Sequence, residues 1–392
     1  MLIYLPMFII AECFALFTAR KYQGNELILM KRKKPMLSEQ HFFYWMTSLP
    51  FLLVAVLRYK VGTDYTVYSR LQIPEVMKGI NDRVEFLYRY VIKLGMAMGD
   101  KHWVFVLTHI IIIYFFWQAM KESDNLPMSL FVFMFGCYYN LSLNTMRQFI
   151  AMGIALYATK YIYQRKFWYY AAWIVIATLF HSTGAVYIIF YFLAKYKLPK
   201  ALPLVASAGC FVLSNVARGI LMRLSSVFTT YEDYLGSEYD KMDTQWDYLL
   251  FNMLLLAVIF VYEIAYAEQD RVNLRNSPKT ILRELLCKVQ RNKTGYVTQE
   301  ELKYQTFVWL QFFTTIFACV SNVIPNSTRI IVLTGVAQMI MVPMILRKLR
   351  VNKDLQAVVT VCIMLLYLMI FYRKILFGNY GETLPYEFIW NR

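Results

Sequence analysis

The chain has 392 residues, of which 59% are hydrophobic, 17% aromatic and only 17% charged. Because soluble domains carry about a quarter of charged residues, this composition excludes an ordinary soluble protein and indicates a polytopic membrane protein. The formal net charge of +16 is spread over loops between apolar segments, so it reports on membrane topology and does not indicate nucleic acid as a partner.

Membrane spans are expected where about 17 to 25 mostly apolar residues follow one another. The first apolar run has neither a basic segment before it nor a cleavage site after it, so we predict a retained span and not a signal peptide. The predicted spans cover residues 2–19, 41–57, 103–120, 127–144, 146–163, 201–223, 248–266, 305–324, 329–346 and 354–372. The predicted fold class is therefore all-α, in a single membrane domain over residues 1–392.

The loop after the second span, residues 58–102, begins with the charged and aromatic stretch LRYKVGTDYTVYSR at 57–70. Farther along it, residues 84–99 place apolar side chains at helical spacing but also carry Glu85, Arg89 and Lys93. This pattern predicts an amphipathic helix at the membrane interface.

The apolar segment 167–197 decides the predicted topology. If it crossed the membrane once, the acidic loop 224–247 would face the cytoplasm and the basic loop 267–304 would face outside, against the positive-inside tendency. If it turns near His181–Gly184 and returns, every loop obeys that tendency. We therefore predict two short or re-entrant helices here, about eleven or twelve transmembrane or re-entrant helices in total, and both termini outside.

This topology places four polar positions on the external face: the loop with Arg58 and Asp64, the loop with Arg147, the turn at His181, and the loop with Arg329. Ionisable groups at the ends of spans commonly mark a substrate path. Because the planar fork of arginine binds phosphate oxygens in pairs, several arginines favour an anionic, phosphate-bearing lipid. No acidic residue lies near Arg147 in the sequence.

Five motifs on this predicted face, in chain order, resemble the EpsG-type, Wzy-like exopolysaccharide repeat-unit polymerases. They are R-x-x-x-G-x-D-Y-x-x-Y at Arg58–Tyr68, N-x-x-R-Q-x-x-A at Asn144–Ala151, the F-H-S turn at Phe180–Gly184, N-x-x-R at Asn326–Arg329, and P-Y-x-F at Pro385–Phe388. The glycine at 184 departs from the pattern, in which alanine or another small apolar residue is common.

The resemblance implies a glycosyltransferase of GT-C-like architecture in the bacterial plasma membrane, with its active site facing outside. Such an enzyme joins polyprenyl-diphosphate-linked oligosaccharides, which serve as donor and acceptor, into exopolysaccharide or capsule. Its other expected partners are membrane lipids, a flippase and a chain-length regulator, and not nucleic acid. No cofactor and no metal are expected, because the sequence has no Asp-x-Asp and no cluster of ligands at metal-binding spacing.

The implied chemistry assigns roles to the motif residues. We expect Arg147 and Arg329, with Arg58 assisting, to stabilise the diphosphate leaving group. We expect His181 or Asp64 to activate the acceptor hydroxyl as a general base. The residues expected to bind substrate, through aromatic faces and short polar side chains, are Tyr65, Tyr68, Tyr139, Asn144, Gln148, Asn326 and Tyr386.

Simpler interpretations of the same residues stay open at this level. Arg58 and Arg329 could be interfacial anchors, Asp64 a turn residue, and His181 a buried structural histidine. Two other functions also remain open: a flippase or transporter of lipid-linked glycans, which would explain the broken helices, and a membrane O-acyltransferase.

Overall fold

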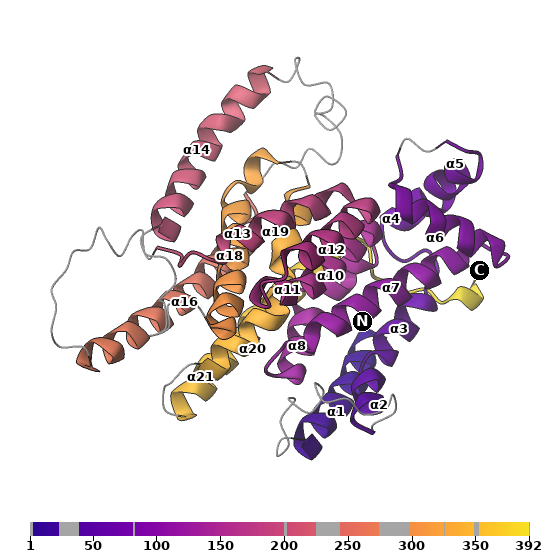
Figure 1. The fold of residues 1–392 in the computed structure, drawn as a ribbon. Coiled ribbons are helices and arrows are strands. Elements are labelled where there is room, and N and C mark those ends of the chain that lie inside the picture. Colours follow the sequence, from indigo (N-terminus) through magenta and orange to yellow (C-terminus); the bar gives the residue numbers. More distant parts are fainter. Residues whose placement is uncertain are drawn as a thin grey trace. The chain divides into compact units, whose positions relative to one another are not determined.

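The computed structural model describes residues 3–22, 39–80, 83–199, 202–224, 244–273, 298–324, 326–348 and 353–391. Within these ranges the chain is built of helices and contains no strand (Figure 1), and its one isolated β-bridge is antiparallel, between Arg58 and Phe388. The predicted all-α fold class is confirmed.

The chain divides into two compact units. The first comprises Met1–Ala158, Trp168–Tyr187 and Gln338–Arg392, and the second comprises Thr159–Phe167 and Ile188–Ala337. The prediction that residues 1–392 form a single membrane domain is not tested by this division into units.

The first unit holds most of the helices. In chain order they are α1 (Tyr4–Tyr22), α2 (Glu39–Met46), α3 (Leu49–Val56), α4 (Asp64–Val67), α5 (Ile73–Met77), α6 (Phe86–Ala97), α7 (His102–Met120), α8 (Leu126–Phe135), α9 (Tyr138–Ser142), α10 (Met146–Ala158), α12 (Phe167–Phe180, all but its first residue), α20 (Gln338–Lys348) and α21 (Lys353–Phe371).

Helices α7 and α10 form the centre of this unit and lie along one another. Gly153 of α10 lets them approach closely, since a Cβ at this position would lie 3.2 Å from the ring of Phe116. Small residues serve this purpose where helices associate in membranes. Trp117 of α7 is fully buried and packs against Phe51 and Phe133, which join α3 and α8 to the same core.

The second unit is arranged around one helix, α18 (Gln299–Cys319), against which three others pack. These are α14 (Leu202–Leu224), α16 (Trp246–Asn273) and α19 (Ser327–Gly335); the short helices α11 (Lys160–Tyr163) and α13 (Phe190–Leu193) also contact α18. The buried amide of Gln311 donates to Asn252 Oδ1 at 3.0 Å and so joins α18 to α16. Such bonds satisfy polar groups that hydrocarbon could not.

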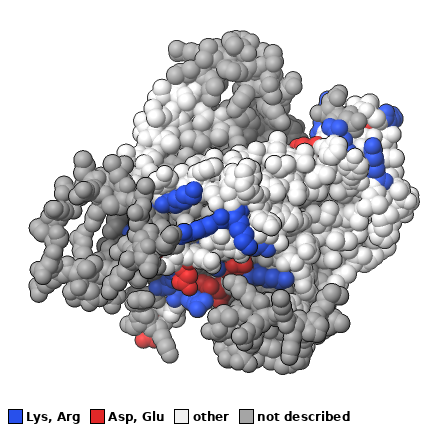
Figure 2. All heavy atoms as spheres, in the orientation of Figure 1, with Lys and Arg blue, Asp and Glu red and all other residues white. Residues whose placement is uncertain are grey.

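Two of the described helices, His102–Met120 and Asp354–Phe377, are long and apolar enough to cross a membrane, and a third span results if Ser327–Gly335 and Gln338–Lys348 count as one interrupted helix. Seven shorter apolar helices accompany them. The last long helix exposes a continuous apolar face made of Val358, Val361, Leu365 and Met369, whose spacing is helical. On the face drawn in Figure 2, wide uncharged areas separate the groups of charged side chains.

Several predicted spans are interrupted, which the apolar pattern did not reveal. The predicted span 41–57 breaks between α2 and α3, where the hydroxyls of Thr47 and Ser48 bond to carbonyls three residues earlier and compete with the helical pattern. The span 127–144 breaks at Cys137, whose backbone is left-handed with φ 64°. The number of complete crossings therefore stays a prediction.

The segment 167–197 forms the predicted hairpin. Helix α12 ends at Phe180, and a 3₁₀ helix (η3, Ser182–Ile189) runs back beside it. Gly184 sits against the α12 backbone, where a Cβ would lie 2.8 Å from Ala177, and the Tyr170 hydroxyl donates to the Tyr187 carbonyl. Since α12 has 14 residues, neither arm has the roughly 20 that a complete crossing needs.

Within the predicted amphipathic stretch 84–99 lies helix α6, which packs on α7; its position at the membrane interface stays a prediction. Most of the predicted loop 224–247 lies outside the described residues. The predicted loop 267–304 is helical at both of its ends, because α16 continues to Asn273 and α18 begins at Gln299; its middle part also lies outside the described residues.

Candidate functional site

Arg58 follows α3 and is fully buried. Its Nη1 donates to the carbonyls of Leu143 and Val61, the latter at 3.3 Å, and its Nη2 lies 3.1 Å from the sulfur of Met146. Burial lowers the pKa of the Arg58 guanidinium, and neighbouring tyrosines, Tyr139 first, counteract this effect. In this arrangement Arg58 organises the backbone of its loop, and a direct contact with substrate stays a prediction.

The C-terminal segment pairs with the loop that follows Arg58. The Gly62 N–H donates to the Glu382 carbonyl at 3.0 Å, and the Thr63 N–H donates to the Gly381 carbonyl at 3.1 Å. Tyr386, in the P-Y-x-F motif, donates its hydroxyl to the Val54 carbonyl at 2.7 Å. The P-Y-x-F motif, whose Phe388 forms a β-bridge with Arg58, therefore anchors the C-terminal segment against the first motif.

Asn144 lies between two glycines that have positive φ, Gly62 (φ +100°) and Gly381 (φ +79°). A Cβ on Gly62 would lie 2.6 Å from Asn144 Oδ1, and one on Gly381 would lie 2.4 Å from Nδ2. The same Oδ1 accepts hydrogen bonds from the Thr63 hydroxyl at 3.2 Å and the Asp64 N–H at 3.4 Å. Asn144 was predicted to bind substrate. In the structure its side chain instead holds the backbone of Asp64 in place.

Asp64 begins α4 and is half-exposed. The helix continues through a π-helical turn (η2, Tyr68–Gln72) into α5. The ring of Tyr65 is buried and stacks on Phe105 with centroids 4.5 Å apart. Such π turns widen a helix locally and are frequent at functional sites. Here the turn begins at Tyr68, which is buried and whose hydroxyl contacts Arg147.

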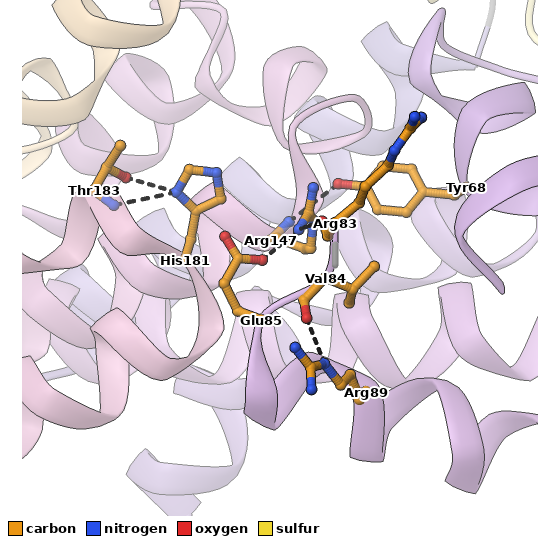
Figure 3. A network of polar contacts seen from close by, with 8 residues as sticks. All are labelled: Tyr68, Arg83, Val84, Glu85, Arg89, Arg147, His181 and Thr183. Carbon is orange, nitrogen blue, oxygen red and sulfur yellow. Dashed lines mark hydrogen bonds and ion pairs between the residues drawn. The ribbon is translucent and has the colours of Figure 1, made fainter. Parts of the chain in front are cut away.

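Arg147, the second residue of α10, is the centre of a polar network (Figure 3). Its guanidinium forms a salt bridge with Glu85, and its Nη1 donates to the Arg83 carbonyl at 2.9 Å. Its backbone N–H, near the open end of the helix, donates to the Tyr68 hydroxyl at 3.5 Å. We call Arg147, Glu85, Tyr68 and Asp64 the Arg147 cluster, since Arg147 and Asp64 both act electrostatically on Tyr68.

The phenol of Tyr68 is held neutral in this cluster. Burial raises its pKa, and the charge of Asp64 raises it further, while Arg147 partly opposes both effects. A neutral phenol next to an arginine can accept from the protein and donate to an incoming anion.

His181 lies in the turn between the two arms of the hairpin. Its Nδ1 lies 2.9 Å from the Thr183 hydroxyl and accepts the Thr183 backbone N–H at 3.3 Å. In Figure 3, Thr183 stands on one side of the imidazole, and Arg147 and Glu85 stand on the other. Both residues belong to the first unit, and the catalytic roles predicted for His181 and Arg147 stay predictions.

The sequence model of the EpsG family matches residues 41–388, nearly the whole chain. The chain belongs to the EpsG family. The resemblance of the five motifs is thereby confirmed, because the matched region includes all of them. EpsG proteins are Wzy-like polymerases, so this is a membrane protein and a glycosyltransferase-like polysaccharide polymerase. No curated protein and no solved structure matches the chain.

Glu85 is the member of the Arg147 cluster that the sequence did not identify as a site residue. It precedes α6 at the N-cap position. From sequence alone, an acidic residue there is interpreted as part of the polar face of an amphipathic helix, which it also stabilises electrostatically. The turn that carries it is fixed by Arg89, whose Nε donates to the Val84 carbonyl. Only the fold of this EpsG protein brings Glu85 to Arg147, from 62 positions away.

The other predicted substrate-binding residues of the first unit are largely enclosed. Tyr139 is fully buried and donates its hydroxyl to the Phe51 carbonyl at 2.9 Å, and Gln148, next to Arg147, is 4% exposed. Their direct contact with sugars stays a prediction. The contacts of Tyr139 are with the core of the first unit, where its ring packs against Phe51 and Phe133.

Asn326 and Arg329 lie in the second unit, where the N-x-x-R motif forms the start of α19. Asn326 has a left-handed backbone (φ 51°), and its carbonyl accepts the Arg329 N–H at 2.9 Å. The Arg329 side chain is exposed. Across the described ranges, no group of three or more His, Cys, Asp and Glu could hold a metal ion, and the metal-free mechanism stays a prediction.

Proposed function

We propose that this EpsG protein polymerises polyprenyl-diphosphate-linked oligosaccharide repeat units at the external face of the bacterial plasma membrane. The observation that carries the proposal is the Arg147 cluster: an arginine 15% exposed, held by Glu85 and by the Arg83 carbonyl, at a helix N-terminus. Preorganised cations stabilise the charge that develops on a phosphate leaving group. The product would be exopolysaccharide or capsule.

The reaction is a glycosyl transfer between two lipid-linked glycans. The acceptor hydroxyl oxygen forms a bond to the anomeric carbon of the donor glycan, while the bond from that carbon to the phosphate oxygen breaks. The bonding electron pair leaves with the lipid diphosphate, and the proton of the hydroxyl passes to a general base. Arg147 stabilises the diphosphate; Arg329 stays a predicted cation for the same leaving group, on sequence grounds alone.

Arg58 contributes to this mechanism through position. Its guanidinium donates to the carbonyls of Val61 and Leu143 and so stabilises the backbone of the segment that leads to Asp64. Two groups are candidates for the base, the half-exposed carboxylate of Asp64 and the imidazole of His181. Either group can act as a general base, since a carboxylate or an imidazole within hydrogen-bond reach can take the hydroxyl proton.

The remaining parts of the proposal concern substrate and partners. Apolar faces such as that of α21 suit contact with lipid chains, and the GT-C-like architecture is proposed on the family relationship. A flippase that delivers lipid-linked units and a regulator of chain length are the proposed partners.

A lipid-linked glycan flippase is the competing function, because short helices and a hairpin resemble the broken helices of transporters. The deciding experiment incubates the purified protein with a synthetic polyprenyl-diphosphate repeat unit, with and without a chelator. A ladder of longer glycans that is insensitive to the chelator supports the polymerase. Translocation of the lipid in vesicles without any coupling would replace it by the flippase, and loss of the ladder on chelation would replace the metal-free mechanism.

A further inference from the structure

We infer that Glu85 is the general base of the glycosyl transfer, and that its pairing with Arg147 couples removal of the acceptor proton to the charge that develops on the diphosphate. This inference rests on the proposed function for the reaction, and it adds a third candidate base to Asp64 and His181. Glu85 is joined to Arg147 by a direct salt bridge, so the base and the cation for the leaving group are held as one unit.

Glu85 stands at the N-cap position of α6, where a polar side chain ordinarily accepts the N–H of the second or third helical residue. The Glu85 side chain makes no such bond to α6. Its Oε2 contacts Arg147 Nη1 instead, although this atom comes from another helix, 62 positions away. The carboxylate is therefore oriented by Arg147 and not by the start of its own helix.

The second oxygen of Glu85, Oε1, is available to substrate. The salt bridge uses Oε2, and in Figure 3 the other oxygen points away from Arg147 and has no dashed line. Within the described ranges Oε1 forms no hydrogen bond, and the Glu85 side chain is 24% exposed, so an acceptor hydroxyl can reach this oxygen. A carboxylate oxygen within hydrogen-bond reach of a hydroxyl can take its proton.

The turn that carries Glu85 is fixed on both sides. Before it, the Arg83 carbonyl accepts from Arg147 Nη1 at 2.9 Å, so the same nitrogen holds both the backbone and the carboxylate of this turn. After it, Arg89 donates its backbone N–H to the Glu85 carbonyl at 3.2 Å and its Nε to the Val84 carbonyl. A general base works efficiently only when it is held in a reactive geometry, and these bonds supply that restraint.

In the inferred step the acceptor hydroxyl lies at Glu85 Oε1, and the donor diphosphate lies at Nη2, the other arm of the Arg147 fork. The acceptor oxygen forms a bond to the anomeric carbon, and its proton passes to Oε1. The bond from that carbon to the phosphate oxygen breaks, and its electron pair stays on the diphosphate. Glu85 becomes neutral while the diphosphate gains one negative charge, so the attraction of Arg147 shifts from the first partner to the second.

This shift has a consequence for the rate. Only interactions that are stronger in the transition state than in the ground state accelerate a chemical step. Before proton transfer the charge of Glu85 competes with the diphosphate for Arg147, and after proton transfer this competition has ended. Removing the charge of Glu85 should therefore lower the turnover number without weakening the binding of the diphosphate, a combination that a purely structural role would not produce.

The test uses the full-length protein in lipid, a synthetic polyprenyl-diphosphate repeat unit for turnover, and polyprenyl diphosphate without a glycan for binding. We expect Glu85→Gln to lower the turnover number roughly 100-fold or more, the contribution of a general base, while its Kd for polyprenyl diphosphate is no weaker than that of the wild type. Glu85→Asp keeps a carboxylate and should turn over faster than Glu85→Gln. Glu75→Gln is the matched control with unchanged turnover, since Glu75 is a half-buried carboxylate in the first turn of α5, in the same loop and outside the Arg147 cluster.

Rescue by a small carboxylate separates a base from a structural residue. Glu85→Ala leaves space where the side chain was, so added formate should restore part of its turnover, whereas formate should not raise the turnover of Arg147→Lys, which keeps its base. Turnover of Glu85→Gln within about tenfold of the wild type overturns the inference, as does a larger loss in Asp64→Asn than in Glu85→Gln. Weaker diphosphate binding in Glu85→Gln, with no formate rescue of Glu85→Ala, also overturns it, because Glu85 would then only orient Arg147. If the wild-type protein forms no polymer, the proposed function fails and the inference fails with it; if the wild type and Glu85→Gln form polymer equally well, the inference alone fails.

Discussion

The carboxylate of Glu85 and the guanidinium of Arg147 form a salt bridge between the start of α6 and the start of α10, 62 positions apart in sequence. Both side chains are mostly covered, with 15% of Arg147 and 24% of Glu85 exposed. The pair fixes a cation at a helix N-terminus and also places a competing anion beside it. These two effects of Glu85 have opposite consequences for an anionic substrate.

Arg147→Lys keeps the charge but should reduce polymer formation by roughly 10- to 100-fold, the range expected when a hydrogen bond to a charged group is lost. Lysine cannot donate at once to Glu85, to the Arg83 carbonyl and to a phosphate, because it lacks the planar fork. The measurements are polymer yield, accumulation of single lipid-linked repeats and the amount of protein in the membrane.

The matched control for this variant is Arg347→Lys. Arg347 also pairs with a carboxylate, that of Asp124 at 3.1 Å, but its side chain is 72% exposed and outside the Arg147 cluster. Normal polymer in Arg147→Lys would return Arg147 to a structural role, and an equal loss in both variants would show that the assay responds to ion pairs in general.

Glu85→Gln should tighten binding of polyprenyl diphosphate by roughly two- to fivefold, since partly solvated ion pairs are worth about 0.2 to 1 kcal/mol. Glutamine can still accept from Arg147, so the guanidinium keeps its orientation while the competing charge is gone. Binding is measured by calorimetry in detergent, with Asp124→Asn as the control that leaves affinity unchanged. Weaker binding in Glu85→Gln would mean that the full charge of Glu85 is needed to orient Arg147.

Gly62→Ala should lower the melting temperature more than Gly79→Ala. Both glycines have positive φ, +100° and +84°, so both variants suffer similar backbone strain. Only at Gly62 would the new Cβ meet Asn144, at 2.6 Å, whereas nothing lies within 4 Å at Gly79. The excess cost should be about 1 to 3 kcal/mol, the range for overpacking.

The same pair of positions provides an internal check. In an Asn144→Ala background the penalty of Gly62→Ala should shrink, because the amide that blocks the Cβ has gone. An equal penalty in both backgrounds would show that strain at Gly62, and not contact with Asn144, is responsible.

The helices and the hairpin could be predicted because they depend on local pattern. Apolar runs show where helices lie, and the charges that flank 167–197 favour a turn near His181 over a single crossing. The helix breaks at Thr47 and Cys137 depend on two side-chain hydroxyls that bond to backbone carbonyls and on one positive φ, and the apolar pattern does not reveal them.

The candidate site could be predicted in its parts but not in its pairings. The motifs identify Arg58, Arg147 and His181, yet sequence distance says nothing of Glu85, which reaches Arg147 through the packing of α6 on α7 and of α7 on α10. The motif predicted that Asn144 binds substrate. Its actual position between Gly62 and Gly381 depends on the pairing of the C-terminal segment with the loop after Arg58, which the sequence does not show. Burial of Arg58 is likewise a tertiary effect.

Gly184→Ala should open the hairpin and lower both the melting temperature and polymer yield. Its Cβ would lie 2.8 Å from backbone atoms of Ala177 and Thr178, which cannot rotate away as a side chain can. Gly209→Ala is the control, since nothing lies within 4 Å of that position in α14, and alanine there should gain up to about 1 kcal/mol in helix stability. A fully stable and active Gly184→Ala protein would contradict the close packing of the two arms.

The external position of the site is tested by labelling single cysteines with a membrane-impermeant maleimide in a cysteine-free background. Thr66 is exposed on α4, whereas the nearby Ser69 is buried, so Thr66→Cys is the better reporter of the loop at 58–102. We expect Thr66→Cys to label in intact cells and Asn292→Cys to label only after permeabilisation, because the charge distribution places their loops on opposite sides. Labelling of both in intact cells, or of neither, would overturn the predicted topology and with it the external location of Arg147, while the structure of the cluster itself would stand.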